Sequence, residues 1–370
     1  MHFVFFCEGQ LGDLLILTPS IRAVKESFPS SRITTIILQR RRYDEQQPVG
    51  PIIGTAATDG TGCVMANNPN VDQVVGLDRH ALRAMGGLRR IIAELKIIRY
   101  LRNLKPDAVV CTFPQDRFVI WGYLSGAKIR IGQKRQNFSW LLTQKPDIDK
   151  DNLNIRDYYL MLVAAAGVHA PNKNTEFFIS DAAHDWATAQ LSRQAISINT
   201  RLIAVHPGAS GYYKVWPPDF FAALIDHLQQ VMQHRVILCG TEFDQHIVTA
   251  IRRHLKTPVI EMKFGQNIEH FAAILMRCRL CISNDSGPRH LSVAVGTPSV
   301  AVMMHHEHRR WKIYDDPVMS TVLQGDEECP VCRRGVCENL IPGGYEYGSY
   351  CIRMITVAHV LKAINDMIER

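Results

Sequence analysis

The feature that most constrains the fold is a repeated alternation of short apolar runs, glycine turns and helical patterns. It begins with the apolar run at residues 3–7 and restarts with another at 202–205. Strands, tight turns and helices repeating in this order build parallel sheets covered by helices on both faces. The chain of 370 residues exceeds one usual core, so we expect an α/β protein with two doubly wound, Rossmann-like domains facing a cleft.

Two interpretations remain for the basic helical pattern at residues 86–105. Its apolar positions recur at helical spacing, and its basic residues lie largely elsewhere. We favour a crossover helix that packs its apolar face on a sheet, because a strand pattern follows at once. The alternative is contact with anionic lipid headgroups. The expected apolar face consists of Leu88, Ile91, Ile92, Leu95, Ile98 and Leu101.

The first glycine turn follows the opening apolar run. Gly9 and Gly12 let the backbone pass close to a ligand, but their G-x-x-G spacing is not the dinucleotide fingerprint. Asp13 falls at the start of the next helix. It either faces the ligand, where a carboxylate can act as a general base, or serves only as a favourable charge at the helix N-terminus.

The most informative turn covers residues 284–291. Pro288 suits the first helical position, and Ser286 or Asp285 suits the cap before it. Backbone N–H groups at a helix start beside Gly287 form an anion site, and Asp285 adds an acceptor for sugar hydroxyls. The alternative is a well-capped turn that binds no ligand.

A lysine and a glutamate lie on turns between these two. Lys214 stands directly before a Val-Trp-Pro stretch, and Glu242 follows a strand pattern. A diphosphate leaving group needs positive charge and N–H donors as its bond breaks, and Lys214 with the helix start near Ser286 can supply both. Together with Asp13, these residues suit group transfer from a nucleotide-linked donor to an alcohol.

The motifs at these turns resemble the heptosyltransferases of lipopolysaccharide biosynthesis, glycosyltransferase family 9, which have the two-domain GT-B fold. The matching stretches are residues 12–19, 206–217 and 284–298, in this order. The resemblance implies an inverting, metal-independent transfer from ADP-L-glycero-D-manno-heptose to a hydroxyl of the lipopolysaccharide inner core. By this resemblance, residues 1–175 bind the acceptor, residues 176–350 bind the nucleotide sugar, and the helix at 351–370 packs back on the first domain.

The same resemblance implies roles for single residues. Asp13 is the general base, and Lys214 meets the donor phosphates. For Lys214 the alternative is a solvated loop lysine, and for His290 it is a capping or core histidine. The donor-binding positions are Ser210, Lys214, Glu242, Asp285, Ser286, Gly287 and His290.

The chain departs from the family after the strand pattern at 299–302. Family members often have a Gly-Pro-Thr type turn there, whereas residues 303–311 of this chain include His305, His306 and His308. This segment is expected near the sugar or diphosphate of the donor, so it bears on donor identity. The histidines favour a polar loop over a metal site, because no second ligand element matches them.

Four cysteines near the C-terminus form a candidate structural metal site. Cys329 and Cys332 make a C-x-x-C pair, and Cys337 and Cys351 follow around a glycine-rich stretch. Four thiolates suit Zn²⁺ or iron, and free thiols or disulfides are the alternatives. Heptosyltransferases that modify bacterial autotransporters resemble this pattern in carrying a cysteine-bound iron. We expect no cofactor in catalysis itself.

Composition indicates the compartment and the partners. No apolar run reaches the length of a membrane span, and the N-terminus does not resemble a signal peptide, so we expect a cytoplasmic protein. The formal net charge of +7 favours anionic partners, such as phosphorylated substrates or the inner membrane surface. No Lys/Arg run interleaved with aromatics indicates nucleic acid.

Two other functions stay open. One keeps the transfer but changes the acceptor to a protein hydroxyl, an alternative that rests on the cysteine cluster. The other is a nucleotide-sugar-binding protein without turnover. The polar loop at 39–62 is the expected place for acceptor specificity, since loops of this length are usually functional lids or disordered.

Overall fold

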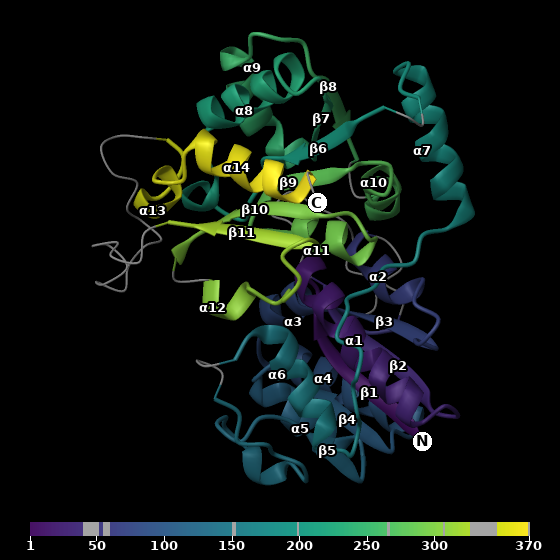
Figure 1. Cartoon of the computed structure of the whole chain (residues 1–370). Coiled ribbons are helices and arrows are strands. Elements are labelled where there is room, and N and C mark those ends of the chain that lie inside the picture. Colours follow the sequence, from purple (N-terminus) through teal and green to yellow (C-terminus); the bar gives the residue numbers. More distant parts are fainter. Residues whose placement is uncertain are drawn as a thin grey trace. The chain divides into compact units, whose positions relative to one another are not determined.

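The computed structural model describes residues 1–39, 52–54, 60–149, 153–197, 200–264, 267–305, 308–325 and 346–368. The chain divides into two compact units, Met1–Phe178 and Ile179–Arg370. Each unit is built on one parallel sheet covered by helices (Figure 1). Most of the loop predicted at 39–62 lies outside the described residues.

The first unit has a five-stranded sheet in the order β3-β2-β1-β4-β5. Val4 and Phe6 of its central strand belong to a core cluster with residues of α4 and α5, while α1 packs against α6. The strands are apolar because both faces of the sheet are covered. The elements are β1 (His2–Glu8), α1 (Leu11–Ser27), β2 (Arg32–Gln39), η1 (Gly60–Gly62), α2 (Cys63–Ala66), β3 (Gln73–Asp78), α3 (Arg79–Ala84), α4 (Gly87–Leu104), β4 (Ala108–Cys111), α5 (Asp116–Leu124), β5 (Ile129–Ile131), η2 (Ser139–Leu141) and α6 (Ile155–Ala164).

The second unit has a six-stranded sheet in the order β11-β10-β9-β6-β7-β8. One face packs on α8, α9 and α14, and α7 packs against α10. The elements are α7 (Asp181–Arg193), β6 (Leu202–His206), η3 (Tyr212–Lys214), α8 (Pro218–Gln230), β7 (Arg235–Gly240), η4 (Glu242–Asp244), α9 (Gln245–His254), β8 (Ile260–Lys263), α10 (Ile268–Leu275), β9 (Leu280–Asn284), α11 (Gly287–Ala294), β10 (Ser299–Met303), α12 (His308–Trp311), β11 (Ser320–Gln324), α13 (Tyr350–Arg353) and α14 (Val357–Ile368).

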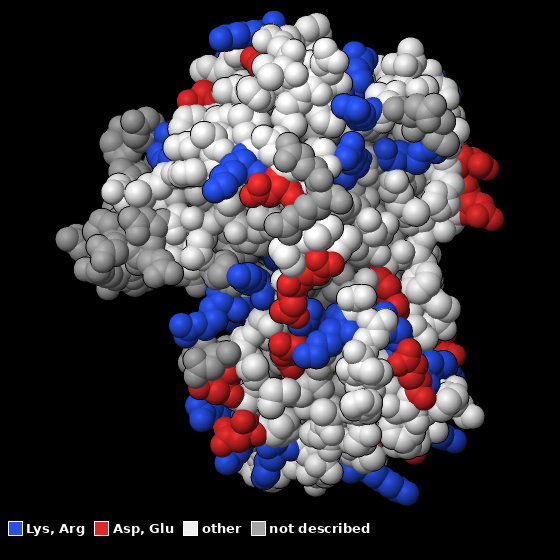
Figure 2. Space-filling view, viewed as in Figure 1, with Lys and Arg blue, Asp and Glu red and all other residues white. Residues whose placement is uncertain are grey.

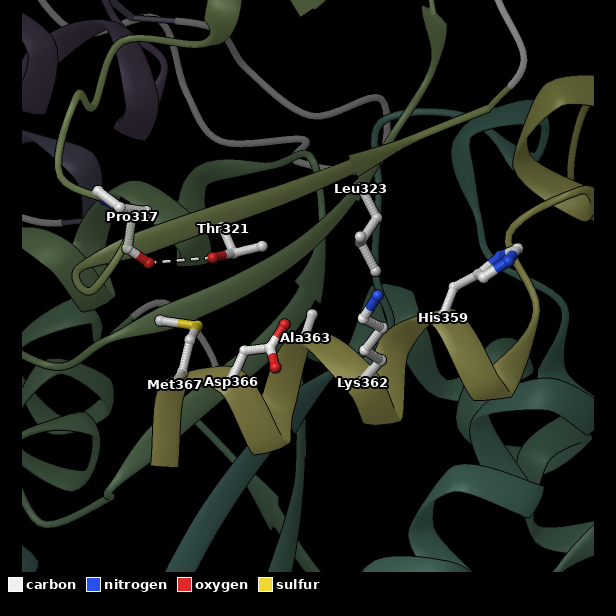
Figure 3. A pocket seen from close by; sticks show the side chains of 8 residues that line it. All are labelled: Pro317, Thr321, Leu323, His359, Lys362, Ala363, Asp366 and Met367. Atoms are coloured by element: carbon white, nitrogen blue, oxygen red, sulfur yellow. Dashed lines mark hydrogen bonds between the residues drawn. The ribbon is translucent and has the colours of Figure 1, made fainter. Parts of the chain in front are cut away.

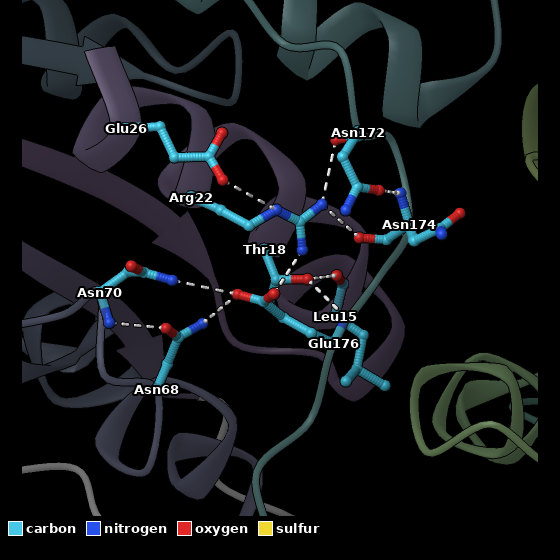
Figure 4. A network of polar contacts seen from close by, with 9 residues as sticks. All are labelled: Leu15, Thr18, Arg22, Glu26, Asn68, Asn70, Asn172, Asn174 and Glu176. Atoms are coloured by element: carbon cyan, nitrogen blue, oxygen red, sulfur yellow. Dashed lines mark hydrogen bonds and ion pairs between the residues drawn. The ribbon is translucent and has the colours of Figure 1, made fainter.

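A polar network fastens the end of the first unit to α1 (Figure 4). Glu176 forms an ion pair with Arg22 of α1, and its backbone N–H donates to Thr18 Oγ1 of the same helix (3.1 Å). The side-chain amides of Asn68 and Asn70 donate to the other carboxylate oxygen, at 3.3 and 3.2 Å. The helix that carries Asp13 is therefore held by segments far from it in sequence.

The closing helix differs from its expected place. Val360, Ala363 and Ile364 of α14 are buried in the core of the second unit, and α14 contacts β10, β11 and α8. The prediction put this helix on the first domain, whereas its apolar face packs on the sheet of its own unit. Two further elements differ from the sequence patterns: residues 177–179 have the pattern of an edge strand but form no strand, and the edge strand β11 was not predicted.

The packing face predicted for α4 is wrong. The helix connects β3 and β4 as expected, but it buries Ala93, Ile97 and Leu101. Only the last of these belongs to the predicted face. The four residues at the start of the predicted face are exposed: Leu88, Ile91, Ile92 and Leu95.

The surface charge is mixed. On the face shown in Figure 2, Lys and Arg side chains are interspersed with Asp and Glu.

Candidate functional site

Two turns lie where doubly wound sheets bind ligands. In the first sheet β1 lies between β2 and β4, and in the second sheet β6 lies between β7 and β9. The strand order therefore reverses between β1 and β4 and between β6 and β9. Ligands bind outside the carboxyl ends of the strands at such switch points. The β1–α1 turn (residues 9–13) and the β9–α11 turn (residues 284–290) each stand at the switch point of their own unit.

The β1–α1 turn lies close against the neighbouring strand. A Cβ on Gly9 would lie 2.2 Å from the carbonyl oxygen of Leu38 in β2, so a side chain does not fit there. Thr61 Oγ1 donates a hydrogen bond to the Gly9 carbonyl oxygen (2.8 Å). Gly12 and Asp13 lie in the first turn of α1, and Asp13 is 6% exposed. Its carboxylate therefore stands at the positive end of a helix.

A basic pocket of about 470 Å³ opens at this edge of the first sheet. Glu8, at the end of β1, is 2% exposed; it accepts a hydrogen bond from Gln115 Nε2 (2.9 Å) and lies 3.6 Å from Arg79 Nη1. The charged residues that line the pocket beside Gln115 are three arginines and one acid: Arg79, Arg83, Arg117 and Asp116. Such a lining suits an anionic group.

In the second unit, the turns after β6 and β7 touch. Burial lowers the pKa of His206, against the raising effect of Asp244, whose carboxylate is 3.9 Å from Nε2. Asp244 is fixed by a capping box with Thr241, whose N and Oγ1 both donate to it at 2.8 Å. A Cβ on Gly208 would lie 2.2 Å from Asp244 Oδ1, so only glycine allows this contact.

The fully buried Asn284, at the end of β9, holds both ends of the segment between β6 and α8. Its Oδ1 accepts from the backbone N–H of Trp216 (2.9 Å), and its Nδ2 donates to the carbonyl oxygen of Pro207 (2.6 Å). An amide side chain offers a donor and an acceptor at once. Asn284 therefore fixes the turn that carries Lys214 relative to the start of α11.

The Lys214 turn is also held by the C-terminal segment. Trp216 is fully buried and donates from Nε1 to the carbonyl oxygen of Ile355 (2.7 Å). The backbone N–H of Gly348 donates to the carbonyl oxygen of Tyr212 (3.0 Å). These contacts hold the backbone of the turn at Lys214 in a defined position, unlike that of a solvated loop.

A buried ion pair stands at the start of α11. Arg289 is 0% exposed; its Nη1 lies 2.8 Å from Asp285 Oδ1, and its Nη2 donates to the carbonyl oxygen of Trp311 (2.6 Å). Burial, and then the charge of Arg289, lower the pKa of His290 well below its ordinary value, so His290 is neutral at pH 7. Its Nδ1 lies 3.1 Å from the hydroxyl of Tyr314.

The structure brings the predicted donor-binding residues to one edge of the second sheet. Ser210 and Lys214 follow β6, and Glu242 follows β7; Ser210 and Glu242 are exposed. Ser286 is the N-cap of α11, as predicted, but it makes no side-chain capping bond, and Gly287 begins the helix. All parallel strands present their carboxyl ends at this edge.

The segment after β10 lies against the start of α11. Met304 is buried, and Trp311 of α12 holds Arg289 through its carbonyl oxygen. His306 and the side chain of His308 lie outside the described residues. The segment that departs from the family pattern, residues 303–311, thus contacts the β9–α11 turn through Trp311 and Arg289.

The cysteine prediction falls mostly outside the described residues, which include only Cys351 of the four. Cys351 is 0% exposed in the core of the second unit, with Sγ 3.5 Å from Ser349 Oγ. Among the residues described, no three His, Cys, Asp or Glu side chains are grouped to hold a metal ion. In the same part of the chain, no helix has the length and apolar character needed to span a membrane.

Another cavity, of about 390 Å³, lies between α14 and β11 (Figure 3). His359, Lys362 and Asp366 of α14 line it opposite Thr321 and Leu323 of β11. No predicted site residue lines this cavity, and we assign it no part in the reaction.

Sequence reasoning missed several residues that shape the site. Arg289 follows Asp285 at the i, i+4 spacing of a helical ion pair. Thr241 and Asp244 have the spacing of a capping box, so this pair could also have been found. Asn284 begins the motif at residues 284–291, but the sequence did not indicate the hydrogen bonds that its side chain makes. The pocket residues, among them Arg79, gave none, because tertiary packing gathers them.

The second unit thus combines a positioned lysine, a helix start and a neutral histidine at one sheet edge. A family model for glycosyltransferase family 9 (heptosyltransferase) matches residues 119–340. The chain belongs to this family. It is therefore a glycosyltransferase, as the motifs predicted. A dinucleotide-dependent dehydrogenase is excluded by this family membership, and the G-x-x-G spacing of Gly9 and Gly12 also disfavours it.

Relatives of this glycosyltransferase match over most of its length. It is 22% identical to "Lipopolysaccharide heptosyltransferase 3" of Escherichia coli (strain K12) over 313 residues, 83% of this chain and 84% of that protein. A family 9 glycosyl transferase from Veillonella parvula has a TM-score of 0.78 at 22% identity, covering 100% and 97% of the two chains. The E. coli "ADP-heptose lps heptosyltransferase II" has a TM-score of 0.71 at 17% identity, covering 100% and 99%. These structures confirm the predicted GT-B fold class.

Proposed function

We propose that this glycosyltransferase moves heptose from ADP-L-glycero-D-manno-heptose to a hydroxyl of the lipopolysaccharide inner core. Family membership supports the transfer. The similarity to a lipopolysaccharide heptosyltransferase over 83% of the chain supports the acceptor, and the fold of an ADP-heptose enzyme supports the donor.

The observation that carries the donor assignment is the Asn284 link. It ties the turn of Lys214 to the β9–α11 turn, with hydrogen bonds of 2.9 and 2.6 Å. Lys214 and the helix start at Ser286 and Gly287 then contact the diphosphate. Their positive charge stabilises the diphosphate more strongly as it becomes more negative during bond breaking. The other residues assigned to the donor are Ser210, Glu242, Asp285 and His290.

Asp13 is the general base in this proposal. It takes the proton of the acceptor hydroxyl, whose oxygen forms a bond to C1 of the heptose from the face opposite the leaving group. The bond between C1 and the diphosphate oxygen breaks, and its electron pair leaves with ADP. The configuration at C1 inverts in this single displacement. Lys214 and the α11 helix start stabilise the leaving diphosphate in place of a metal ion.

The first unit binds the acceptor in this proposal. The pocket lined by Arg79, Arg83 and Arg117 suits the negative groups of a lipopolysaccharide core. The loop at 39–62 remains the predicted place for acceptor specificity. The enzyme works in the cytoplasm, where it meets its acceptor at the inner membrane surface.

Calorimetric titration tests the donor assignment. ADP-heptose and ADP are compared with UDP-glucose and GDP-mannose, on wild type, Lys214→Ala and the control Lys256→Ala. Lys256 is exposed beyond the far end of α9. We expect preference for the ADP compounds and about tenfold weaker ADP-heptose binding, near 1.4 kcal/mol, only in Lys214→Ala. Equal binding of all the compounds would contradict the assignment of heptose as the donor sugar and would leave the fold assignment unchanged.

Turnover separates the remaining alternatives. Mass spectrometry follows heptose addition to truncated lipopolysaccharide and to a serine-containing peptide. Addition to the peptide alone would make the protein a protein-modifying transferase. Donor binding without turnover on either acceptor would make it a nucleotide-sugar-binding protein.

A structural Zn²⁺ or iron at Cys329, Cys332, Cys337 and Cys351 is proposed separately. It is supported by the close contact between Cys351 and Gly325, which precedes the C-x-x-C pair: a Cβ added at Gly325 would lie 2.1 Å from the Cys351 carbonyl oxygen. Elemental analysis of the purified chain tests this, with Cys329→Ser as the comparison. Equal metal content in both would contradict it.

A further inference from the structure

Helix α4 has two apolar stripes, and the fold uses one of them. Ala93, Ile97 and Leu101 are 3%, 0% and 0% exposed in the core of the first unit. A second stripe points away from the core: Leu88, Ile91, Ile92 and Leu95 are 70%, 57%, 45% and 59% exposed. No other helix among the described residues carries more than one exposed large apolar residue.

The spacing of the second stripe places it opposite the first. Residues 88, 91, 92 and 95 follow the i, i+3, i+4, i+7 pattern of one helix face. At about 100° per residue, the centres of the two stripes are about 180° apart. Packing of α4 on its own unit therefore does not account for the outer stripe. A contiguous exposed patch of large aliphatic side chains marks an interaction surface.

The charges on α4 favour a negative partner. Arg89, Lys96 and Arg99 are exposed on the helix; Arg99 lies beside the outer stripe, and the other two flank it. The helix has one acidic residue, Glu94, and it is turned towards the protein. Its carboxylate lies 3.6 Å from Arg90 Nε and 3.4 Å from Arg117 Nε, and it accepts from Trp121 Nε1 (3.3 Å).

We propose that the α4 outer face, formed by Leu88, Ile91, Ile92 and Leu95 with Arg89, Lys96 and Arg99, docks on an anionic lipid bilayer. Its aliphatic side chains enter the boundary between headgroups and acyl chains, and its cations contact the negative headgroups. The stripe presents branched aliphatic side chains on a convex helix, which needs no matching pocket in its partner. This surface goes beyond the transfer reaction and does not depend on the identity of its donor.

Docking brings the basic pocket of the first unit towards the membrane. Arg117 lines that pocket and pairs with Glu94 of α4. A ligand anchored in the bilayer by acyl chains then meets the pocket with its polar part. The helix acts as a fixed attachment point, because its inner stripe is locked into the core.

Sedimentation with phospholipid vesicles tests the proposal. The full chain is mixed with vesicles of phosphatidylglycerol and phosphatidylcholine, and in parallel with phosphatidylcholine alone. We expect binding to the anionic vesicles, weakened by salt. Leu88→Gln/Leu95→Gln should weaken it about tenfold, because two large apolar side chains no longer enter the interface. Lys96→Gln/Arg99→Gln should weaken it by several-fold and reduce its salt dependence.

The matched control is Met161→Gln/Val231→Gln, which removes exposed apolar residues from α6 and from the end of α8. It should bind vesicles as the wild type does. Circular dichroism checks that each variant keeps its helix, since glutamine is a good helix former. The proposal is overturned if the wild type does not sediment with anionic vesicles, or if the stripe variant binds as well as the control. It is also overturned if light scattering shows a dimer that the stripe variant dissociates.

Discussion

The β1–α1 turn and the β9–α11 turn both stand at the switch point of their own sheet, but their aspartates have different surroundings. Each turn follows a strand at the switch point, but Asp13 lies in the first turn of α1, whereas Asp285 precedes Ser286, the N-cap of α11. Asp285 is followed four residues later by the buried Arg289, which balances its charge at 2.8 Å. Asp13 is followed at the same distance by the buried Leu17. Asp285 therefore has a buried counter-charge on its own helix, and the general-base role proposed for Asp13 is tested by substitution below.

The packing around the two turns supports this difference. Arg289 is tied to Trp311 and lies over the ring of Tyr314, so the second turn is built around a fixed cation. The first turn is built around a close backbone contact between Gly9 and Leu38. A turn with a permanent internal ion pair suits binding of a rigid anionic donor, and a turn with an acid at a helix start suits proton transfer.

The largest expected effect separates the two aspartates by turnover. Asp13→Asn should lower kcat by about 10³-fold, because the amide accepts no proton from the hydroxyl, while the dissociation constant for ADP-heptose stays unchanged. The control Asp181→Asn removes an acid from the first turn of α7. An ADP-release assay measures kcat. Full activity in Asp13→Asn would show that Asp13 serves only as a favourable charge at the N-terminus of α1. The proposed difference between the two aspartates would then be wrong.

The next effect is on stability. Asp285→Asn leaves Arg289 buried without its counter-charge and should lower the free energy of unfolding by about 3 kcal/mol. Adding Arg289→Met to this variant should recover much of the loss, since no buried charge then remains. Urea denaturation measures both. A loss no larger than that of an exposed aspartate would show that the pair is not structural.

A smaller effect is expected from the glycine of the first turn. Gly9→Ala forces a Cβ against the Leu38 carbonyl and should destabilise the chain by about 1–3 kcal/mol. Gly240→Ala is the matched control, since its Cβ would meet its nearest neighbour at 3.4 Å, an ordinary contact. Thermal unfolding of the two variants compares them. Equal midpoints would mean that the first turn adapts easily.

The smallest effect concerns pH. The folded pKa of His290 lies well below the 6.5 expected when unfolded. The unfolded chain therefore takes up a proton in this range that the folded chain does not, so stability falls as pH drops below about 6.5. His290→Gln should lose less stability between about pH 7 and pH 5 than the wild type. Some dependence should remain from His206, whose pKa is also lowered by burial. An unchanged slope would contradict the burial of a neutral His290.

The order of elements followed from the sequence because parallel strands buried on both faces are apolar runs. Helix α4 shows where such patterns fail. Its strongest apolar stripe was predicted to pack inward, yet Ala93 and Ile97 take that place. Small residues such as Ala93 let a helix approach a sheet closely, and periodicity alone does not rank two opposite stripes. Helix α14 was likewise assigned the wrong surface, since it was predicted to pack on the first domain and packs on the sheet of its own unit.

The site was predictable where a residue acts through its neighbours in sequence. The turn around Ser286 and Gly287 could be located from its strand, cap and helix pattern. The links made by Asn284 could not, because its partners Trp216 and Pro207 lie far away along the chain. The basic pocket was missed for the same reason, as its arginines come from different helices.

The sequence by itself determined the two parallel-sheet units, the glycine turns and the family, since these rest on local periodicity, backbone freedom and short motifs. Tertiary structure decided which acid is engaged by a buried arginine, which turn holds Lys214 in place and which stripe of α4 stays exposed. Those outcomes depend on burial and on contacts between distant residues. Burial sets the cost of an unpaired charge or an unmade hydrogen bond, and it is a property of the folded chain alone.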